Sequence, residues 1–118
     1  MSWTYQQLRA VYGPPPRRLA EPCRVGAIQA AVAHYYDISV RTMLAKDNRP
    51  EIVHPRHVAM FLARSITGKY LTALGKLFGG RDHTTVLSAI RKIERQLVSD
   101  PVLADDVKRL REYLEAAQ

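Results

Sequence analysis

The sequence predicts an all-α protein, a helical bundle that contains a helix-turn-helix. Apolar residues recur at three- and four-residue steps along most of the chain, which is the spacing of amphipathic helices. No segment shows the alternation of apolar and polar residues that is typical of a half-buried strand. The length of 118 residues, with 47% hydrophobic and 25% charged residues, fits one globular domain that buries a core of its own.

The N-terminal residues 1–12 carry aromatic and aliphatic side chains at the spacing of a short amphipathic helix. A glycine and three prolines end this helix, and residues 13–23 are expected to be an extended, proline-rich connector. We therefore divide the chain into an N-terminal arm, residues 1–23, and a helical domain, residues 24–118. The aromatic element either docks on the bundle or engages a partner protein, and docking is the favoured alternative.

Three helices are predicted in the first half of the helical domain. The apolar spacing favours a long helix from Val25 to about Asp37, and Ser39 is a suitable N-cap for a short helix after it. Because proline suits the first turn of a helix and glycine its end, a third helix is expected from Pro55 to Gly68.

A helix-turn-helix is predicted next. A short helix over residues 71–78 is followed by two glycines, which permit the positive φ angles of a tight turn. Asp82 or Thr84 is a suitable cap for the second helix, which carries an apolar stripe up to Leu97. A last helix with several acidic residues follows Pro101.

The charge of the chain is concentrated in its centre. The chain has 18 Lys and Arg against 11 Asp and Glu, a net charge of +7. Residues 38–99 hold eleven basic and four acidic side chains, whereas residues 1–37 sum to +2 and residues 100–118 to −2. Such a concentration predicts one positively charged face, which a phosphate backbone would require.

The start of the second helix of the motif carries the sequence Asp82-His83-Thr84-Thr85. In helix-turn-helix proteins the first residues of the second helix meet base edges in the major groove. A carboxylate accepts from cytosine N4, an imidazole donates or accepts, and a threonine methyl packs on the thymine methyl. The alternative is structural: Asp82 and Thr85 only cap the helix, and His83 is an ordinary surface residue.

A longer run of residues resembles a known family. The sequence Gly-Gly-Arg-Asp-His-Thr-Thr-Val-Leu over residues 79–87 is followed by Ala89 and by Arg-Lys-Ile-Glu over residues 91–94. This run resembles the signature of the DNA-binding domain, domain IV, of the bacterial replication initiator DnaA, and the resemblance covers residues 25–115. It implies an all-helical bundle related in shape to the Trp repressor, which recognises a short asymmetric duplex site called the DnaA box.

The resemblance also implies roles for individual residues. Asp82, His83 and Thr84 would contact bases, and Arg49 would take the place of an arginine that the family inserts into the minor groove. Phosphate contacts are expected from residues around the two helices of the motif and from its basic face. They are Thr85, Arg56, His57, Lys69, Leu71, Thr72, Arg81, Ser88 and Lys92.

Two departures from the family are visible in the sequence. The family arginine aligns with Asn48, one residue before Arg49, and Asp47 and Glu51 would oppose an approach of this loop to phosphate. The sequence also has no Gly-x-x-x-x-Gly-Lys-Ser/Thr loop and no length for an ATPase domain, so we expect no ATPase activity of its own.

Other classes of function are disfavoured. The only cysteine, Cys23, has no partner for an internal disulfide, and the four histidines and the acidic residues show no metal-ligand or catalytic spacing. We therefore expect no enzyme, no cofactor, no metal and no membrane span, and a cytoplasmic, nucleoid-associated location. The remaining hypotheses are sequence-specific binding of double-stranded DNA, in transcription regulation or replication control, and a protein-interaction module that kept the fold. Residues 1–12 and the acidic last helix would then form the contact surface, and residues 1–12 would contact replication or transcription proteins.

Overall fold

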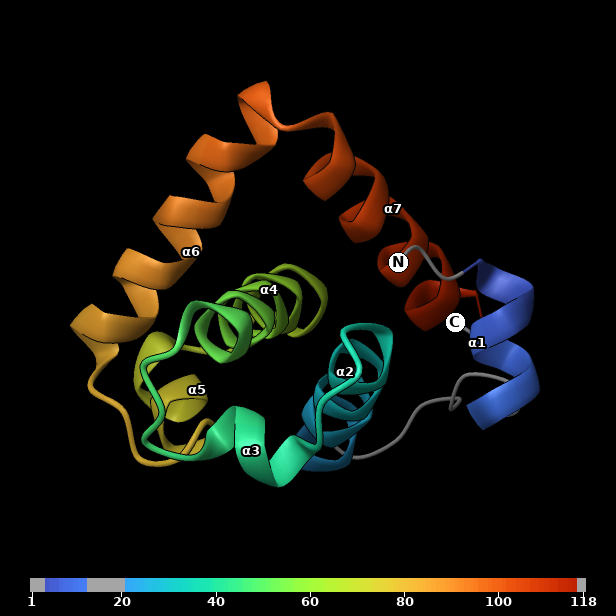
Figure 1. Ribbon diagram of the computed structural model, residues 1–118. Coiled ribbons are helices and arrows are strands. Elements are labelled where there is room, and N and C mark those ends of the chain that lie inside the picture. Colours follow the sequence, from blue (N-terminus) through green and yellow to red (C-terminus); the bar gives the residue numbers. More distant parts are fainter. Residues whose placement is uncertain (1–3, 13–20, 117–118) are drawn as a thin grey trace.

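The computed structural model describes residues 4–12 and 21–116, which form helices and no strand (Figure 1). The prediction of an all-α fold is confirmed. The helices in chain order are α1 (Tyr5–Tyr12), α2 (Glu21–Tyr35), α3 (Val40–Leu44), α4 (Pro50–Thr67), α5 (Leu71–Leu77), α6 (His83–Ser99) and α7 (Pro101–Glu115).

Helix α4 lies at the centre of the bundle. It packs against α2 and α6, and it also contacts α3, α5 and α7 (Figure 1). Val58, Ala59 and Leu62 on this helix are fully buried. Because burial of one Val or Leu side chain contributes about 1.5–3 kcal/mol, this helix holds the elements that surround it in place.

Helix α4 begins at Pro50, so the predicted start at Pro55 is wrong. Pro50 occupies the first turn, where a missing N–H breaks no helical hydrogen bond, and the N–H of Ile52 already donates to the carbonyl of Arg49 at 2.9 Å. Pro55 lies inside the helix. Because Pro55 has no N–H, the carbonyl of Glu51 loses its helical hydrogen-bond donor. Glu51 is exposed, so water can bond to this carbonyl instead.

The N-terminal element packs on the bundle. Leu8 of α1 is fully buried, and α1 lies against α7 (Figure 1). Docking is therefore the alternative that the structure shows, although binding of a partner by residues 1–12 stays a prediction. Helix α2 starts at Glu21, so the predicted connector over 13–23 and the predicted helix start at Val25 are both wrong by a few residues. The rest of that connector lies outside the described residues.

A buried carboxylate joins α2 to α7. The hydroxyl of Tyr35 donates to Asp106 Oδ1 at 2.5 Å, and the hydroxyl of Tyr36 lies 3.4 Å from Asp106 Oδ2. Burial, together with the nearby charge of Asp106, raises the pKa of Tyr36 above its usual value. The two hydroxyls satisfy the carboxylate within the core, so this ion is a structural element of the bundle.

Candidate nucleic-acid interface

The turn between α5 and α6 is fixed by glycines. Gly79 and Gly80 have φ angles of 84° and 75°, a region that side chains other than glycine rarely adopt. Within α5, Gly75 is buried against the backbone of Arg81, and the N–H of Arg81 donates to the carbonyl of Gly75 at 2.8 Å. The predicted helix-turn-helix is present, and this close contact sets the direction in which α6 leaves the turn.

The first residues of α6 are both capped and exposed. Asp82 is the N-cap, and its Oδ2 accepts from the N–H of Thr84 at 3.0 Å and from the Thr84 hydroxyl. The hydrogen bonds from Thr84 lower the pKa of Asp82. His83 Nδ1 lies 3.4 Å from Asp82 Oδ1. All four residues from Asp82 to Thr85 are exposed, so the cap and the predicted base contacts are compatible with each other.

Helix α6 presents a polar and basic face to solvent. One side of the helix is apolar and buried through Val86, Ala89, Ile90 and Ile93. The remaining surface carries hydroxyls near the start of the helix and cations further along. The exposed residues of this face include Thr84, Thr85, Ser88, Arg91, Lys92 and Arg95, and the acidic Glu94 is exposed on the same helix. Three of the eleven basic residues of segment 38–99, in which the sequence concentrates positive charge, therefore lie on this face.

A cleft of about 380 Å³, here called the loop cleft, adjoins the start of α6. It lies between the α3–α4 loop, α4 and the turn of the motif. Its lining includes the cationic side chains of Lys46, Arg56 and Arg81 and, from α6, Thr85. The structure thus brings together predicted site residues from segments far apart in the sequence.

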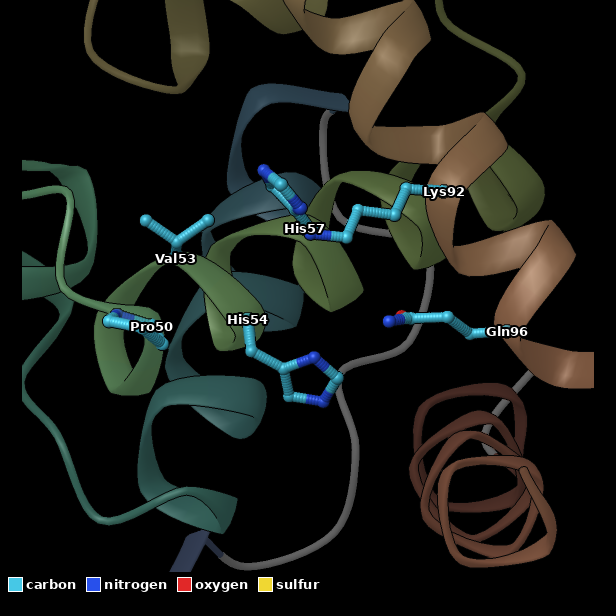
Figure 2. Close-up of a pocket in the computed structure, with 6 residues that line it drawn as sticks. All are labelled: Pro50, Val53, His54, His57, Lys92 and Gln96. Atoms are coloured by element: carbon cyan, nitrogen blue, oxygen red, sulfur yellow. The ribbon is translucent and has the colours of Figure 1, made fainter.

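A smaller cleft of about 210 Å³ continues the loop cleft along α6. The two clefts share Val53 and His57, and in the smaller one His57 of α4 and Lys92 of α6 face each other beside His54 and Gln96 (Figure 2). Five of the residues predicted to contact phosphate therefore line these two adjoining clefts beside α6, namely Arg56, His57, Arg81, Thr85 and Lys92.

Two arginines of this set, Arg56 and Arg81, donate hydrogen bonds to backbone carbonyls within the protein. Arg56, only 4% exposed, donates from Nε to the carbonyl of Met43 at 2.7 Å and from Nη2 to the carbonyls of Ala45 and Asp47 at 2.9 Å each. Arg81 donates from Nη2 to the carbonyl of Ala45 at 2.8 Å and also bonds two other carbonyls. Phosphate contact by these residues stays a prediction. Their observed role is to hold the α3–α4 loop against the motif.

The predicted minor-groove residue is also engaged. Arg49 lies on the exposed side of the α3–α4 loop, and its Nη2 lies 2.7 Å from Asp47 Oδ2. Glu51 approaches the same guanidinium, with Oε1 at 3.9 Å from Nε. The opposition of Asp47 and Glu51 to an approach of DNA is expected from the sequence, whereas the direct ion pair between Asp47 and Arg49 is visible only in the structure.

The remaining predicted phosphate contacts cluster at the start of α5. Lys69 and Leu71 are half-buried, and Leu71 packs against the core, whereas Thr72 is exposed. Tyr70 lies beside them but was not among the predicted contacts. It is the N-cap of α5, is 81% exposed and makes no side-chain cap hydrogen bond. A tyrosine where Ser, Thr, Asp or Asn is favoured was the available signal.

Burial in the groove makes His57 hard to protonate. Desolvation, with Lys92 and Arg56 nearby, lowers the pKa of His57 from 6.5 to about 4. Acid therefore favours the unfolded chain, whose histidine binds the proton more readily. The contribution of His57 to stability is complete above about pH 6.5 and is lost as the pH falls towards 4.

We expect the thermal unfolding midpoint to fall between pH 7 and pH 5, and the fall to be smaller in His57→Gln. Lys92→Gln keeps the imidazole but removes the cation that disfavours its protonation, so its fall should lie between those of the other two proteins. The measurement is thermal unfolding followed by circular dichroism at several pH values. If the unfolding midpoint fell by the same amount in the wild type, His57→Gln and Lys92→Gln, the pH dependence could not be assigned to His57.

Within the described part of the chain, no three or more His, Cys, Asp or Glu side chains gather where they could hold a metal ion. None of the helices described combines the length and the apolar character that crossing a bilayer requires.

A helical bundle with a glycine-fixed turn, a second helix that exposes polar residues at its start, and a cationic groove beside that helix together define a DNA-binding helix-turn-helix module. Residues 25–93 match the family model for the bacterial dnaA protein helix-turn-helix, and the chain belongs to this family.

Relatives of the chain are full-length initiators. A chromosomal replication initiator protein DnaA of Nitrobacter hamburgensis is 42% identical over 100 residues, which are 85% of this chain and 20% of the relative. The protein of the same name from Cereibacter sphaeroides is 44% identical over 89 residues, covering 75% of this chain and 20% of the relative. The chain thus spans about a fifth of the length of the curated relatives it matches.

Proposed function

We propose that the chain binds double-stranded DNA sequence-specifically at sites that resemble the DnaA box, without ATPase activity of its own. The observation that carries the proposal is the exposed run from Asp82 to Thr85 at a capped helix start, directly beside the cationic loop cleft. A helix start of this kind enters the major groove, and the adjacent cations meet the phosphates that border it.

Each part of the interface has a separate task. Asp82, His83 and Thr84 present a carboxylate, an imidazole and a methyl group to base edges, which is the chemistry that distinguishes base pairs. Thr85, Ser88 and Lys92 lie on the same exposed face and bind phosphate oxygens. Phosphate contacts position the helix but carry no sequence information, so specificity rests on the first group.

The biological role follows from the kind of site. The relatives are named chromosomal replication initiators, and a protein that occupies the same sites would compete with them or mark the same DNA. We infer a role in replication control or in transcription regulation, at the nucleoid in the cytoplasm.

The primary test compares two duplexes. A labelled duplex that contains a DnaA box and a scrambled duplex of the same composition are titrated with the protein at two salt concentrations. We expect the box to bind at least about a thousandfold more tightly, and both affinities to fall as salt rises. Equal affinity for the two duplexes would refute sequence-specific binding.

A single substitution tests the assignment of the base contacts. His83→Ala is expected to cost about 1–3 kcal/mol of binding to the box and to reduce the preference for the box over the scrambled duplex. Lys92→Ala is the matched control from the same helix, and it should weaken both duplexes by a similar factor, because phosphates are common to both. Unchanged discrimination in His83→Ala would show that the start of α6 does not recognise bases.

A second candidate function is favoured by one observation. Val98 and Val102 are 88% and 66% exposed where α6 meets α7, the corner at the top of Figure 1. Exposed aliphatic side chains beside an acidic helix suit contact with another protein. A chain that shifts no duplex at low salt would favour this protein-interaction function, and Val98→Asp should then abolish capture of the partner without affecting the fold.

A further inference from the structure

The guanidinium of Arg49 is held by a carboxylate of its own loop. Arg49 Nε lies 3.1 Å from both oxygens of Asp47, and Nη2 lies 2.7 Å from Oδ2. The backbone N–H of Arg49 also donates to Asp47 Oδ1 at 3.0 Å. One edge of the guanidinium fork therefore points at a carboxylate in the two-donor geometry that guanidinium groups also use to bind phosphate.

The loop and the first turn of α4 together have no net charge. Lys46 and Arg49 of the loop are balanced by Asp47 of the loop and Glu51 of α4, although the loop forms one wall of the cationic loop cleft. The pairing also lowers the pKa of Asp47 to about 2, so the carboxylate stays ionised at neutral pH. Asp47 thus presents a permanent negative charge at the edge of the surface that would receive DNA.

The α3–α4 loop is held in place beside this surface. Its backbone is fixed by Arg56, whose Nη2 binds the carbonyls of Ala45 and Asp47, and by Arg81, whose Nη2 binds the carbonyl of Ala45. Because both arginines anchor the loop, Asp47 and Arg49 keep a fixed position relative to α4 and to the turn of the motif. The choice between Asp47 and an incoming phosphate as the partner of Arg49 therefore involves only the side chains, because the loop itself stays in place.

We propose that Asp47 competes with DNA for Arg49 and thereby limits the contribution of the α3–α4 loop to binding. This inference rests on the proposed DNA binding. In the free protein the carboxylate occupies the guanidinium, and contact with DNA requires an exchange of one anion for another. Such an exchange gains little free energy, because a carboxylate and a phosphate bind guanidinium in similar ways. Recognition then depends mainly on α6, and Asp47 determines how far the loop adds to it.

The exchange predicts a specific salt dependence. A phosphate contact that displaces a counterion steepens the dependence of log affinity on log salt by about 0.9. While Asp47 already neutralises Arg49, this residue has little counterion to release. Removal of the Asp47 charge should therefore steepen the measured slope of log affinity against log salt by close to the amount that one phosphate contact contributes.

The test is Asp47→Asn, measured as affinity for a duplex with a DnaA box over a series of salt concentrations. Asparagine keeps an oxygen that accepts the Arg49 N–H, so the turn is preserved while the charge is removed. We expect about a two- to tenfold gain in affinity at low salt. Glu51→Gln is the matched control, because it removes one negative charge from the adjoining first turn of α4, where the carboxylate lies at the longer distance of 3.9 Å from Arg49 Nε, and it should give a smaller gain.

A double-mutant cycle separates competition from general electrostatics. In an Arg49→Gln background, Asp47→Asn should give no larger a gain than Glu51→Gln gives, because the cation for which Asp47 competes is absent. An equal gain with and without Arg49, or an unchanged salt slope in Asp47→Asn, would overturn the proposal. The wild-type titration in the same series tests DNA binding itself. Wild-type binding to the box with no effect of Asp47→Asn would refute only the competition.

Discussion

Gly75→Ala is expected to destabilise the protein by about 3 kcal/mol and to remove most of its DNA binding. A β-carbon at this position would collide with the carbonyl oxygen of Arg81, and its distance to the carbonyl carbon would be 3.1 Å. The obstructing atoms are backbone, so the turn has to move. Since the turn sets the direction of α6, the proposed base contacts would be misplaced even in the folded fraction.

Gly26→Ala is the matched control for this result. Gly26 also lies within a helix, but a β-carbon there would meet nothing within 4 Å. The same substitution should raise stability by about 0.5–1 kcal/mol, because alanine favours a helix over glycine. Urea unfolding and duplex titration of both variants check the prediction. If Gly75→Ala were as stable as Gly26→Ala, the claim that Gly75 of α5 packs too closely on the turn to admit a β-carbon would be contradicted.

Arg56→Ala is expected to cost about 2–4 kcal/mol of unfolding free energy. The substitution removes a charged donor from the carbonyls of Met43, Ala45 and Asp47, in a side chain that is 4% exposed. Carbonyls that lose their partner in a partly buried loop retain the cost of desolvation. The α3–α4 loop should then exchange its amide hydrogens faster than in the wild type.

Two further variants make the Arg56 result specific. Arg91→Ala removes an exposed cation of α6 and should change stability by no more than about 0.5 kcal/mol. Arg56→Lys keeps the charge, but an ammonium group does not reproduce the fork of the guanidinium, so an intermediate loss is expected. Urea unfolding gives the stabilities, and hydrogen exchange reports on the loop. A loss in Arg56→Ala no greater than that in Arg91→Ala would show that the anchor does not stabilise the loop.

The regular elements were the most predictable part of the fold. The helix-turn-helix was predicted correctly because Gly79, Gly80 and the capping residue Asp82 act locally, on the residues next to them. The errors fall at helix starts that contain proline. Both Pro50 and Pro55 are compatible with the first turn, and only packing against the core decides how many residues precede Pro55 in the helix.

The candidate site was predictable in composition but not in arrangement. The sequence indicates that Asp82 to Thr85 are polar and that cations surround them, and the structure shows these four residues exposed. The sequence does not indicate which of these cations face solvent. Arg56 and Arg81 bond to carbonyls in a segment that precedes them by up to 37 residues, and no local pattern reports such a contact.

The order of residues along the chain was sufficient to determine the helices, the tight turn and the central excess of positive charge, because these depend on spacing and on backbone preferences of neighbouring residues. Only the tertiary structure decided which arginines anchor the α3–α4 loop and which carboxylate holds Arg49. The physical reason is that burial and pairing of a charge depend on groups brought close by packing, and the free energy of an ion is set by those neighbours.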